Sequence, residues 1–450
     1  MIDENIFPEE GEEGMKRLTS GIILSLLLIS VLTAKLNIQP VMASGISIRE
    51  DGSVYPPTAP IRRDGNVYIL TANIYESITI NRDNIAIDGD NHVIDGRNAG
   101  PYDSGIDIRD RYGVTVRNVI VKKFHKGIFL LGRSINNKLI NNTITDCGCG
   151  IYIESGVYDF PSLNIISGNT ITTNVGVGVF INQGGGIRGP HNNTLSQNVI
   201  TNNGGEGIAI YGSSNNSLLG NIIKNNRDGG ILLLDETSGN TMSGNTLSGN
   251  IIKNNGDYGI SLGSHHNTLS NNIITKHKYG ISIHRGRNIG TYGYNQVFGN
   301  IIADNLWYGI SIGTEDQYFK TSGNRIYHND FINNTVQAYS YKSSNTWDNG
   351  YPSGGNYWSD YAGIDSNRDG IGDTPYTIDE YNRDRYPLMK RCSDAGPDQP
   401  DNADKESQSP AEAFPMWIIC VTIATVAIVT AAIVIFWRKR RQHPTKVSEN

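Results

Sequence analysis

The chain is poor in the residues that mark several common protein classes. Its 450 residues include only four cysteines, too few for a disulfide-bonded scaffold. Charged residues make up 18% of the sequence, the formal net charge is -6, and basic runs occur only beside the apolar segments near the two ends. This balance argues against nucleic-acid binding. The repeats described below contain no stretch of ten residues with a helical period, which argues against helical repeat architectures.

Glycine and asparagine, by contrast, are abundant and recur at regular intervals. A Gly-Ile/Val-x-Ile/Leu motif alternates with an Asn-x-apolar-x-x-Asn-x-apolar motif, and a repeating unit of about 21–29 residues predicts a solenoid. The motif glycines are Gly105, Gly127, Gly150, Gly178, Gly207, Gly230, Gly259, Gly280 and Gly309. The asparagine pairs are Asn137/Asn142, Asn164/Asn169, Asn193/Asn198, Asn216/Asn221, Asn267/Asn272, Asn295/Asn300 and Asn324/Asn329.

Each unit holds three short bursts of apolar residues separated by Gly/Asn corners, and this pattern predicts an all-β fold. We therefore expect a parallel β-helix solenoid with three strands per coil and roughly ten coils. Equivalent residues would stack about 4.7–4.9 Å apart, so the asparagines would form hydrogen-bonded ladders at the corners. Residues 44–104 would form an amino-terminal cap, residues 105–340 the repeats, and residues 341–391 a Trp/Tyr-rich cap with an Asp-rich loop.

One corner of the coil varies in length. The interval from the second Asn of a pair to the next Gly is 8 or 9 residues, whereas the interval from Gly to the next Asn is either 8–10 or 14–15 residues. We take Asn240 as the next motif asparagine after Gly230. The long intervals then fall in two pairs of adjacent coils, and coils with short intervals lie between these pairs. We therefore expect two walls and a saddle that together form a groove for an extended glycan. The walls are residues 154–163 with 182–192, and residues 284–294 with 313–323.

Aromatic rings in these loops can stack on sugar faces, and arginine or carboxylate groups can bind hydroxyls or uronates. The loops could equally be tolerated surface insertions. The predicted glycan-binding residues are Tyr158, Phe160, Arg188 and His191 in the first wall, Tyr211, Asp235 and Glu236 in the saddle, and His284, Arg285, Arg287, Tyr292, Tyr294 and Tyr318 in the second wall.

No catalytic set is recognisable in the sequence. Lyases and hydrolases on this scaffold need carboxylates paired on one face, or carboxylates with an Arg or Lys base. Asp146 and Asp304 share one corner column, but they would lie about six coils apart. The catalytic residues therefore stay unassigned.

Two metal ions are possible cofactors. Residues 365–373 follow the opening of an EF-type calcium loop, although Tyr376 stands where a bidentate Glu is expected. Copper would suit the pair Cys147 and Cys149 together with His265 and His266, but these two pairs fall several coils apart. The predicted structural Ca²⁺ ligands are Asp365, Asn367, Asp369, the carbonyl of Ile371, and Asp373.

The ends of the chain predict a membrane-anchored surface protein. Residues 1–43 hold a signal segment with a cleavage site before Ser44, and the acidic residues 3–13 suggest Met15 as the true start. Residues 392–415 would form a disordered stalk, residues 416–437 an uncharged transmembrane helix, and residues 438–450 a basic cytoplasmic tail. We expect a single-pass protein of the cell membrane whose β-helix is extracellular.

These motifs resemble the NosD-type family of right-handed parallel β-helix proteins, whose domain is also called carbohydrate-binding and sugar-hydrolase-like. The likeness extends over about residues 46–390. It includes the segment from Ile85 to Gly89 and the tail block from Gly355 to Tyr361, which resembles archaeal membrane-anchored surface members most. The resemblance implies a right-handed helix, and either copper processing for nitrous oxide reductase or polysaccharide binding or cleavage.

The sequence favours non-catalytic binding of an extracellular or surface polysaccharide. Three alternatives stay open: a polysaccharide lyase, hydrolase or epimerase; a structural surface-layer or adhesion protein; and a copper-binding accessory protein for nitrous oxide reductase maturation. The identity of the glycan and the oligomeric state are not predicted.

Overall fold

The computed structural model describes residues 45–235, 244–284, 292–313 and 321–394. These residues belong to one compact unit. None of the helices among them is long and apolar enough to cross a membrane. The predicted signal segment, transmembrane helix and cytoplasmic tail lie outside the described residues.

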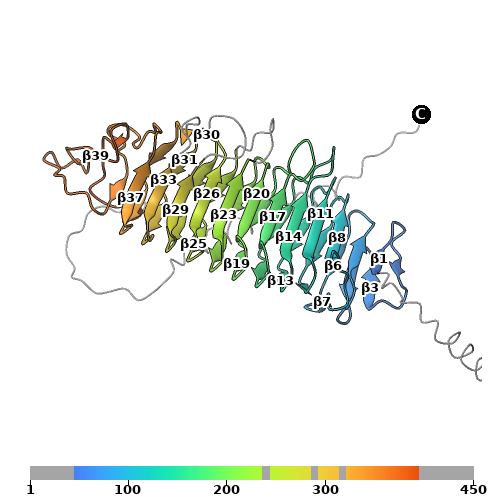
Figure 1. The fold of residues 1–450 in the computed structure, drawn as a ribbon. Helices are drawn as coiled ribbons and strands as arrows, with labels where there is room; N and C mark the ends of the chain where they lie inside the picture. The colour runs from blue at the N-terminus through green and yellow to red at the C-terminus, as the bar shows by residue number, and fades with distance from the viewer. Residues whose placement is uncertain (1–44, 236–243, 285–291, 314–320, 395–450) are drawn as a thin grey trace, which may run out of the picture. The chain divides into compact units, whose positions relative to one another are not determined.

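The chain winds into a solenoid whose sides are three parallel sheets (Figure 1). We call the 13-stranded sheet A, the 12-stranded sheet B and the 11-stranded sheet C. Each coil contributes one strand to each sheet in turn, as in β14 (Cys149–Glu154), β15 (Ile165–Ser167) and β16 (Thr170–Thr172). The prediction of an all-β parallel solenoid with three strands per coil is therefore confirmed.

The strands of each sheet stack in parallel register, apart from short antiparallel hairpins at the amino-terminal end. The remaining strands of sheet A are β1 (Ile46–Ile48), β2 (Val54–Tyr55), β5 (Ile78–Ile80), β8 (Ser104–Arg109), β11 (Lys126–Leu131), β17 (Val179–Asn182), β20 (Ile208–Tyr211), β23 (Gly229–Leu234), β26 (Tyr258–Gly263), β29 (Tyr279–Ile283), β33 (Tyr308–Ile312) and β37 (Val336–Ser340). Those of sheet B are β3 (Ile61–Asp64), β4 (Val67–Leu70), β6 (Ala86–Asp88), β9 (Thr115–Arg117), β12 (Lys138–Ile140), β18 (Thr194–Ser196), β21 (Ser217–Leu219), β24 (Thr246–Ser248), β27 (Thr268–Ser270), β31 (Gln296–Phe298) and β35 (Arg325–Tyr327). Those of sheet C are β7 (Val93–Asp95), β10 (Ile120–Lys122), β13 (Thr143–Thr145), β19 (Val199–Thr201), β22 (Ile222–Lys224), β25 (Ile251–Lys253), β28 (Ile273–Thr275), β32 (Ile301–Ala303), β36 (Asp330–Ile332) and β38 (Tyr357–Trp358).

Smaller elements complete the described fold. They are the pairs β30 (Tyr292–Gly293) with β34 (Thr321–Ser322) and β39 (Tyr376–Thr377) with β40 (Arg383–Asp384), and a short 3₁₀ helix, η1 (Cys392–Asp394). The β39–β40 hairpin lies in the carboxyl-terminal cap, at the opposite end of the solenoid from β1 (Figure 1).

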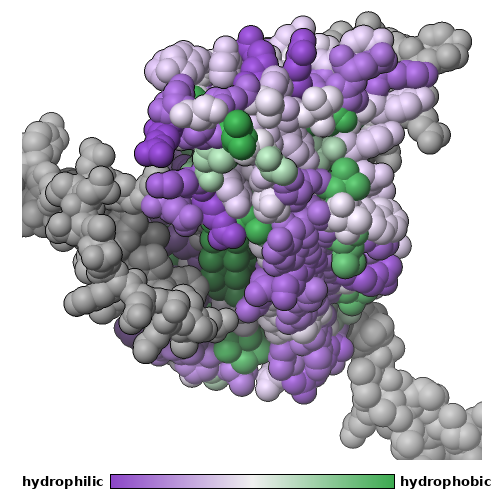
Figure 2. Space-filling model, turned by 90° about the vertical axis from the view of Figure 1, so that its left-hand side faces the viewer, coloured by the Kyte–Doolittle hydropathy of each residue, from purple (hydrophilic) through white to green (hydrophobic). Residues whose placement is uncertain are grey.

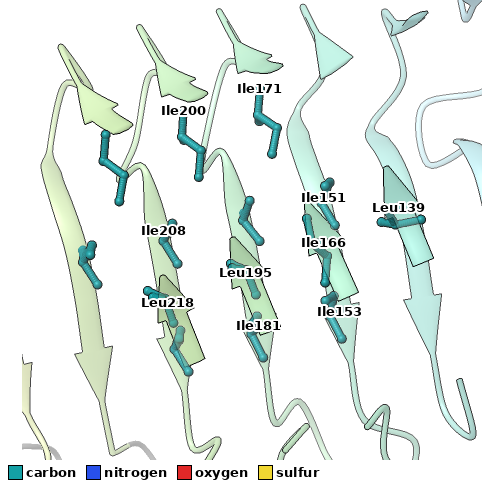
Figure 3. Packing of buried hydrophobic residues seen from close by; sticks show 14 of the residues in the cluster. Leu139, Ile151, Ile153, Ile166, Ile171, Ile181, Leu195, Ile200, Ile208 and Leu218 are labelled. Atoms are coloured by element: carbon teal, nitrogen blue, oxygen red, sulfur yellow. The ribbon is translucent and has the colours of Figure 1, made fainter. Parts of the chain in front are cut away.

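The core of the solenoid consists of aliphatic columns. Inward residues of successive coils stack directly on one another, as Figure 3 shows for Ile151, Ile153 and Ile166 with their equivalents. These three side chains are fully buried. Because each strand alternates inward and outward residues, the motif Gly-Ile-x-Ile places its two isoleucines in the core and the residue between them on the outer face.

Two asparagine ladders occupy the corners on either side of sheet B, which confirms that prediction. The backbone N–H and the Nδ2 group of Asn198 both donate to Oδ1 of Asn221 in the next coil, at 3.0 and 2.9 Å. This double contact recurs from coil to coil. One ladder runs through Asn137, Asn164, Asn193, Asn216, Asn245, Asn267, Asn295, Asn324 and Asn345, and the other through Asn142, Asn169, Asn198, Asn221, Asn250, Asn272, Asn300, Asn329 and Asn356.

A third ladder, which the sequence did not reveal, lies at the corner between sheets C and A. It contains one histidine: Asn255 Nδ2 donates to Nε2 of His277 at 3.2 Å, and Nδ1 of His277 lies 3.3 Å from Oδ1 of Asn305. Only a neutral imidazole with its proton on Nδ1 satisfies both contacts, and burial lowers the pKa of His277 to about 4. The ladder runs through Cys147, Asn174, Asn203, Asn226, Asn255, His277, Asn305, Asn334 and Gln337.

The predicted saddle is wrong. Asn216 donates directly to Asn245, so Asn245 and not Asn240 is the ladder residue of the coil that begins at Gly230. That coil therefore also carries a long connection, between β23 and β24, in the middle of the region where short loops were expected. Residues 236–243 of this connection lie outside the described residues.

Candidate functional site

The outer face of sheet A carries a column of aromatic rings in its amino-terminal half. Phe129 and Tyr152 stack with centroids 5.6 Å apart, and Tyr152 and Phe180 stack at 5.2 Å. Tyr211 closes the column by meeting Phe180 edge to face at 5.0 Å. Of these rings, only that of Tyr211 was among the predicted glycan-binding residues.

Charged groups surround the start of this column. The Lys126 ammonium lies 4.0 Å from the centroid of Phe129 and 4.7 Å from that of Tyr152. Arg109 donates to Oδ2 of Asp107 at 2.7 Å, whereas the buried Oδ1 of Asp107 has no hydrogen-bond partner among the described residues. Burial raises the pKa of Asp107 above its usual range.

A hydrogen-bonded group joins three residues of neighbouring strands β14 and β17. The Tyr152 hydroxyl donates to Oε1 of Glu154 at 3.0 Å, and Asn182 Nδ2 donates to the Tyr152 oxygen at 3.0 Å. Burial and the charge of Glu154 raise the pKa of Tyr152. At neutral pH this phenol is therefore a neutral hydrogen-bond donor and not a phenolate base.

The carboxyl-terminal half of the same face is aromatic and more exposed. Tyr279 and Tyr308 stack at 5.7 Å, and Tyr308 meets Tyr339 at 5.2 Å. Trp307 lies 5.2 Å from Tyr279 with its ring at 88° to the tyrosine plane, and 47% of its surface is exposed. The rings of Tyr279, Trp307 and Tyr308 line an open cavity of about 420 Å³, which Val336 and Thr335 complete.

A tyrosine connects the two halves of the face. Tyr258 donates its hydroxyl to Oε1 of Glu206 at 3.0 Å. Its ring covers Gly229 so closely that a Cβ there would collide with it. Glycine at this position therefore leaves room for the Tyr258 ring against the sheet.

In the first predicted wall, the structure brings two of the four residues together. Phe160 packs against His191 with centroids 5.6 Å apart. Tyr158 is 76% exposed, and Arg188 is also exposed. Of the predicted contacts in this wall, the structure therefore shows the pair Phe160 and His191.

The middle of the face and the second wall are described only in part. Asp235 is buried, the His284 ring bonds Ser261 through Nε2 at 2.7 Å, and Tyr294 stacks on His266 at 5.3 Å. The side chain of Tyr292 is outside the described residues, as are the predicted site residues Glu236, Arg285, Arg287 and Tyr318.

The Asp-rich loop folds as a series of side-chain turns. Asp365 accepts from the backbone N–H groups of Asp369 and Gly370 at 3.2 and 2.9 Å. Asp373 accepts from the N–H and hydroxyl of Ser366, and these bonds lower its pKa. Within the described residues, no group of three or more His, Cys, Asp and Glu side chains could hold a metal ion. The calcium site of Asp365, Asn367, Asp369, Ile371 and Asp373 therefore stays a prediction from sequence.

The residues named for copper lie at two separate corners of the solenoid, and the copper site stays a prediction from sequence. The Cys147 thiol is buried and lies 3.3 Å from the Thr145 carbonyl. Burial raises the pKa of Cys147 to about 11 and that of Cys149 to about 12. Both thiols are therefore protonated at neutral pH, and a bound metal ion would have to displace their protons. His265 and His266 pack against each other at another corner, between β26 and β27.

Comparison with known families agrees with this fold. Residues 241–363 match the family described as periplasmic copper-binding protein (NosD), and residues 34–191 and 76–247 match the right handed beta helix region. The chain belongs to the NosD-type right-handed parallel β-helix family. No curated protein matches the sequence.

Solved structures similar to this NosD-type chain include two A-modules of mannuronan C-5 epimerases from Azotobacter vinelandii. AlgE6 shares 16% identity, with 63% of this chain and 80% of that chain covered and a TM-score of 0.44. AlgE4 shares 16%, with 67% and 85% covered and a TM-score of 0.38. The GH136 lacto-N-biosidase from Eubacterium ramulus shares 13%, with 62% and 59% covered and a TM-score of 0.39. At these identities, the likeness concerns the fold alone.

Proposed function

We propose that this NosD-type chain binds a polysaccharide along the outer face of sheet A without changing it chemically. The observation that carries the proposal is the half-exposed Trp307, which lines an open cavity of about 420 Å³ with Tyr279 and Tyr308. Large aromatic side chains are costly to leave in water. Rings beside an open cavity suit a ligand with apolar faces and polar edges, which describes a sugar ring.

The ring geometry assigns different tasks to the aromatic residues. Tyr308 stacks on Tyr279 and packs against Tyr339 at a tilt of 39°, so mainly its edge and hydroxyl are left for a ligand. Trp307 stands nearly perpendicular to Tyr279 and is outside that stack. We assign the stacking contact with a sugar to Trp307, and hydrogen bonds with sugar hydroxyls to the tyrosines.

The length of the face favours an extended chain over a single sugar. Sheet A places β11 and β29 six strands apart, which corresponds to about 29 Å at the usual strand spacing. Along this distance the face presents Lys126, Glu154, Asn182 and Tyr211, whose polar groups can bind hydroxyls or acidic sugars. The predicted loop residues would then lie along one side of the bound polysaccharide.

A binding screen of the full chain against a panel of neutral and acidic polysaccharides tests this proposal. Retention of one or more polysaccharides, with no new chain ends in the recovered material, is the expected result. The proposal fails if no polysaccharide is retained, or if retention of a neutral polysaccharide survives the loss of both Trp307 and Tyr308.

One observation favours a second candidate function, a polysaccharide lyase, hydrolase or epimerase. Tyr152, Glu154 and Asn182 form a hydrogen-bonded group, and Asp107, whose pKa is raised, lies two strands away on the same face. Shifted pKa values and converging polar groups are typical of catalytic sites. New reducing ends, unsaturated ends or an altered uronate composition after incubation would favour this function over binding alone.

We also propose that the chain acts at the cell surface, held by the predicted membrane segment 416–437, as in archaeal surface members of the family. The support is the sequence of the two ends. Protease treatment of intact cells should then remove the β-helix while the basic tail stays protected. Cleavage only after lysis would contradict an extracellular location.

A further inference from the structure

A second open cavity, of about 570 Å³, lies in the carboxyl-terminal cap, away from sheet A. Four separate segments contribute to it. Its lining residues are His328, Ser353, Arg368, Asp369, Gly370, Leu388, Lys390, Arg391 and Cys392.

Backbone contacts fix these segments relative to one another. Leu388 bridges to both Ile371 and Tyr357, and the N–H of Met389 donates to the carbonyl of Gly370 at 3.0 Å. The N–H groups of Cys392 and Ser393 donate to the carboxylate of buried Asp330 at 2.7 and 3.1 Å. The cavity is therefore part of the folded cap.

The cavity collects positive charge that the described residues do not neutralise. Arg368, Lys390 and Arg391 are exposed, and none of them forms an ion pair within the described part of the chain. By contrast, Arg385 on the same cap donates twice to Asp348, at 2.9 and 2.7 Å.

Asp330, which contacts the segment after Arg391, and Asp369, which lines the cavity, are already hydrogen-bonded. Asp330 accepts the two backbone N–H groups named above. Asp369, which lines the cavity, accepts from the N–H of Ile371 and from Asn367 Nδ2, each at 2.9 Å. Counting one negative charge for Asp369 against the three cations, the lining has a net charge of about +2 with His328 neutral.

We propose that this cavity binds an acidic saccharide unit through Arg368, Lys390 and Arg391. Guanidinium groups pair well with carboxylate and sulfate oxygens, and Leu388 gives the cavity an apolar wall. The volume falls in the range of small-molecule sites and is larger than a bare inorganic anion requires. The carboxyl-terminal end is mostly hydrophilic with small, separate hydrophobic patches (Figure 2), so it offers charge and not a broad apolar surface.

Calorimetric titration of the full chain at low ionic strength tests the proposal with three probes: trigalacturonate, the neutral galactotriose and inorganic sulfate. Trigalacturonate should bind, galactotriose should not, and sulfate should bind at least tenfold more weakly than trigalacturonate. Raising the salt to physiological concentration should weaken trigalacturonate binding, because the contacts are solvent-exposed ion pairs.

Two variants locate the binding on the protein. The double variant Arg368→Gln with Arg391→Gln should lose at least tenfold in affinity for trigalacturonate, and Lys390→Gln alone should weaken it in the same direction. Arg383→Gln is the matched control, because Arg383 is an exposed arginine of the same cap that does not line the cavity. Unfolding curves of each variant confirm that the cap is intact.

Three results would overturn the inference: no binding of trigalacturonate, equal binding of galactotriose, or binding that the arginine variants leave unchanged. Sulfate that binds as tightly as trigalacturonate would show a simple anion site and contradict the saccharide class. The variant Trp307→Ala with Tyr308→Ala should keep this binding, because those residues lie on sheet A. The two proposals can therefore fail separately.

Discussion

The interior corners and the outer face of sheet A share the same coils but follow opposite rules. At the corners, asparagine recurs and each contact copies the one below it, as from Asn198 to Asn221 and on to Asn250. On the outer face, equivalent positions hold Phe129, Tyr152, Ala209 or Leu232. The residues that maintain the coil therefore repeat from coil to coil, whereas the residues that could contact a ligand vary.

The largest effect should follow from breaking a corner. Asn221→Ala would leave the buried N–H of Asn198 and the carbonyl of Leu195 without their partners. Each of these two buried orphan groups costs about 1–3 kcal/mol, so we expect a loss of about 2–6 kcal/mol in the free energy of unfolding. Denaturant titration measures it, and Lys224→Ala, an exposed change on the neighbouring strand, is the control. A loss below that of the control would show that the ladder is dispensable.

The corner also contains a pH-dependent weak point at His277. Its folded pKa is about 4, whereas an unfolded histidine titrates near 6.5. Above pH 6.5 both states are neutral and His277 has no effect. As the pH falls from 6.5 to 4, the unfolded state takes up the proton first, and stability should decrease by up to about 3 kcal/mol.

The variant His277→Asn should remove this pH dependence, because asparagine continues the ladder without titrating. Unfolding curves at pH 7 and pH 4.5 for the native chain and the variant give the difference. Burial raises the pKa of Asp384 to about 6, so its contribution to the stability of the fold is lost as the pH rises through 6. This contribution is the same in the native chain and the variant. His125→Asn, at an exposed histidine, should leave the native pH dependence in place.

On the outer face, the expected loss is one of binding and not of stability. Trp307→Ala with Tyr308→Ala should weaken polysaccharide retention at least tenfold, because both rings line the cavity on sheet A. Affinity electrophoresis measures the change. The control is Phe298→Ala with Tyr327→Ala, a stacked pair on sheet B with centroids 5.3 Å apart. Equal losses in both double variants would mean that any exposed aromatic pair suffices.

The smallest effect should come from the amino-terminal half of the face. Tyr152→Phe keeps the ring stack but removes the hydroxyl that joins Glu154 and Asn182. If this half only binds, we expect less than about a threefold change in retention, which corresponds to the loss of one hydrogen bond to a ligand. If instead a measurable release of new chain ends disappears in this variant, the face is catalytic.

The sequence was sufficient to predict the architecture because the interior repeats. The Gly-Ile-x-Ile frame gave the strands of sheet A, and the paired asparagines gave two of the ladders. The third ladder was missed because Cys147 and His277 replace asparagine in it and because neighbouring doublets such as Asn225 and Asn226 conceal its period.

The candidate site was harder to predict because its residues do not repeat from coil to coil. Asn240 lies five residues before Asn245, which is also the spacing within a ladder pair, so the two could not be distinguished without the stacking contact to Asn216. The outward residues Phe129 and Phe180 occupy the variable position of the motif. Nothing in the sequence marks them until stacking places them side by side on sheet A.

The polarity of the ladders has a consequence for how the molecule can grow. In the ladder from Asn142 to Asn329, the side-chain oxygen of each asparagine accepts from the coil before it, and its backbone N–H and Nδ2 donate to the asparagine of the coil after it. An inserted coil would therefore meet a donor on one side and an acceptor on the other. Only the two ends of this ladder differ. At one end the backbone N–H of Val119 donates to Oδ1 of Asn142, and at the other the backbone N–H of Asn356 donates to the carboxylate of Asp384. Duplication of a single genetic segment could therefore lengthen the binding face coil by coil while both caps stay unchanged.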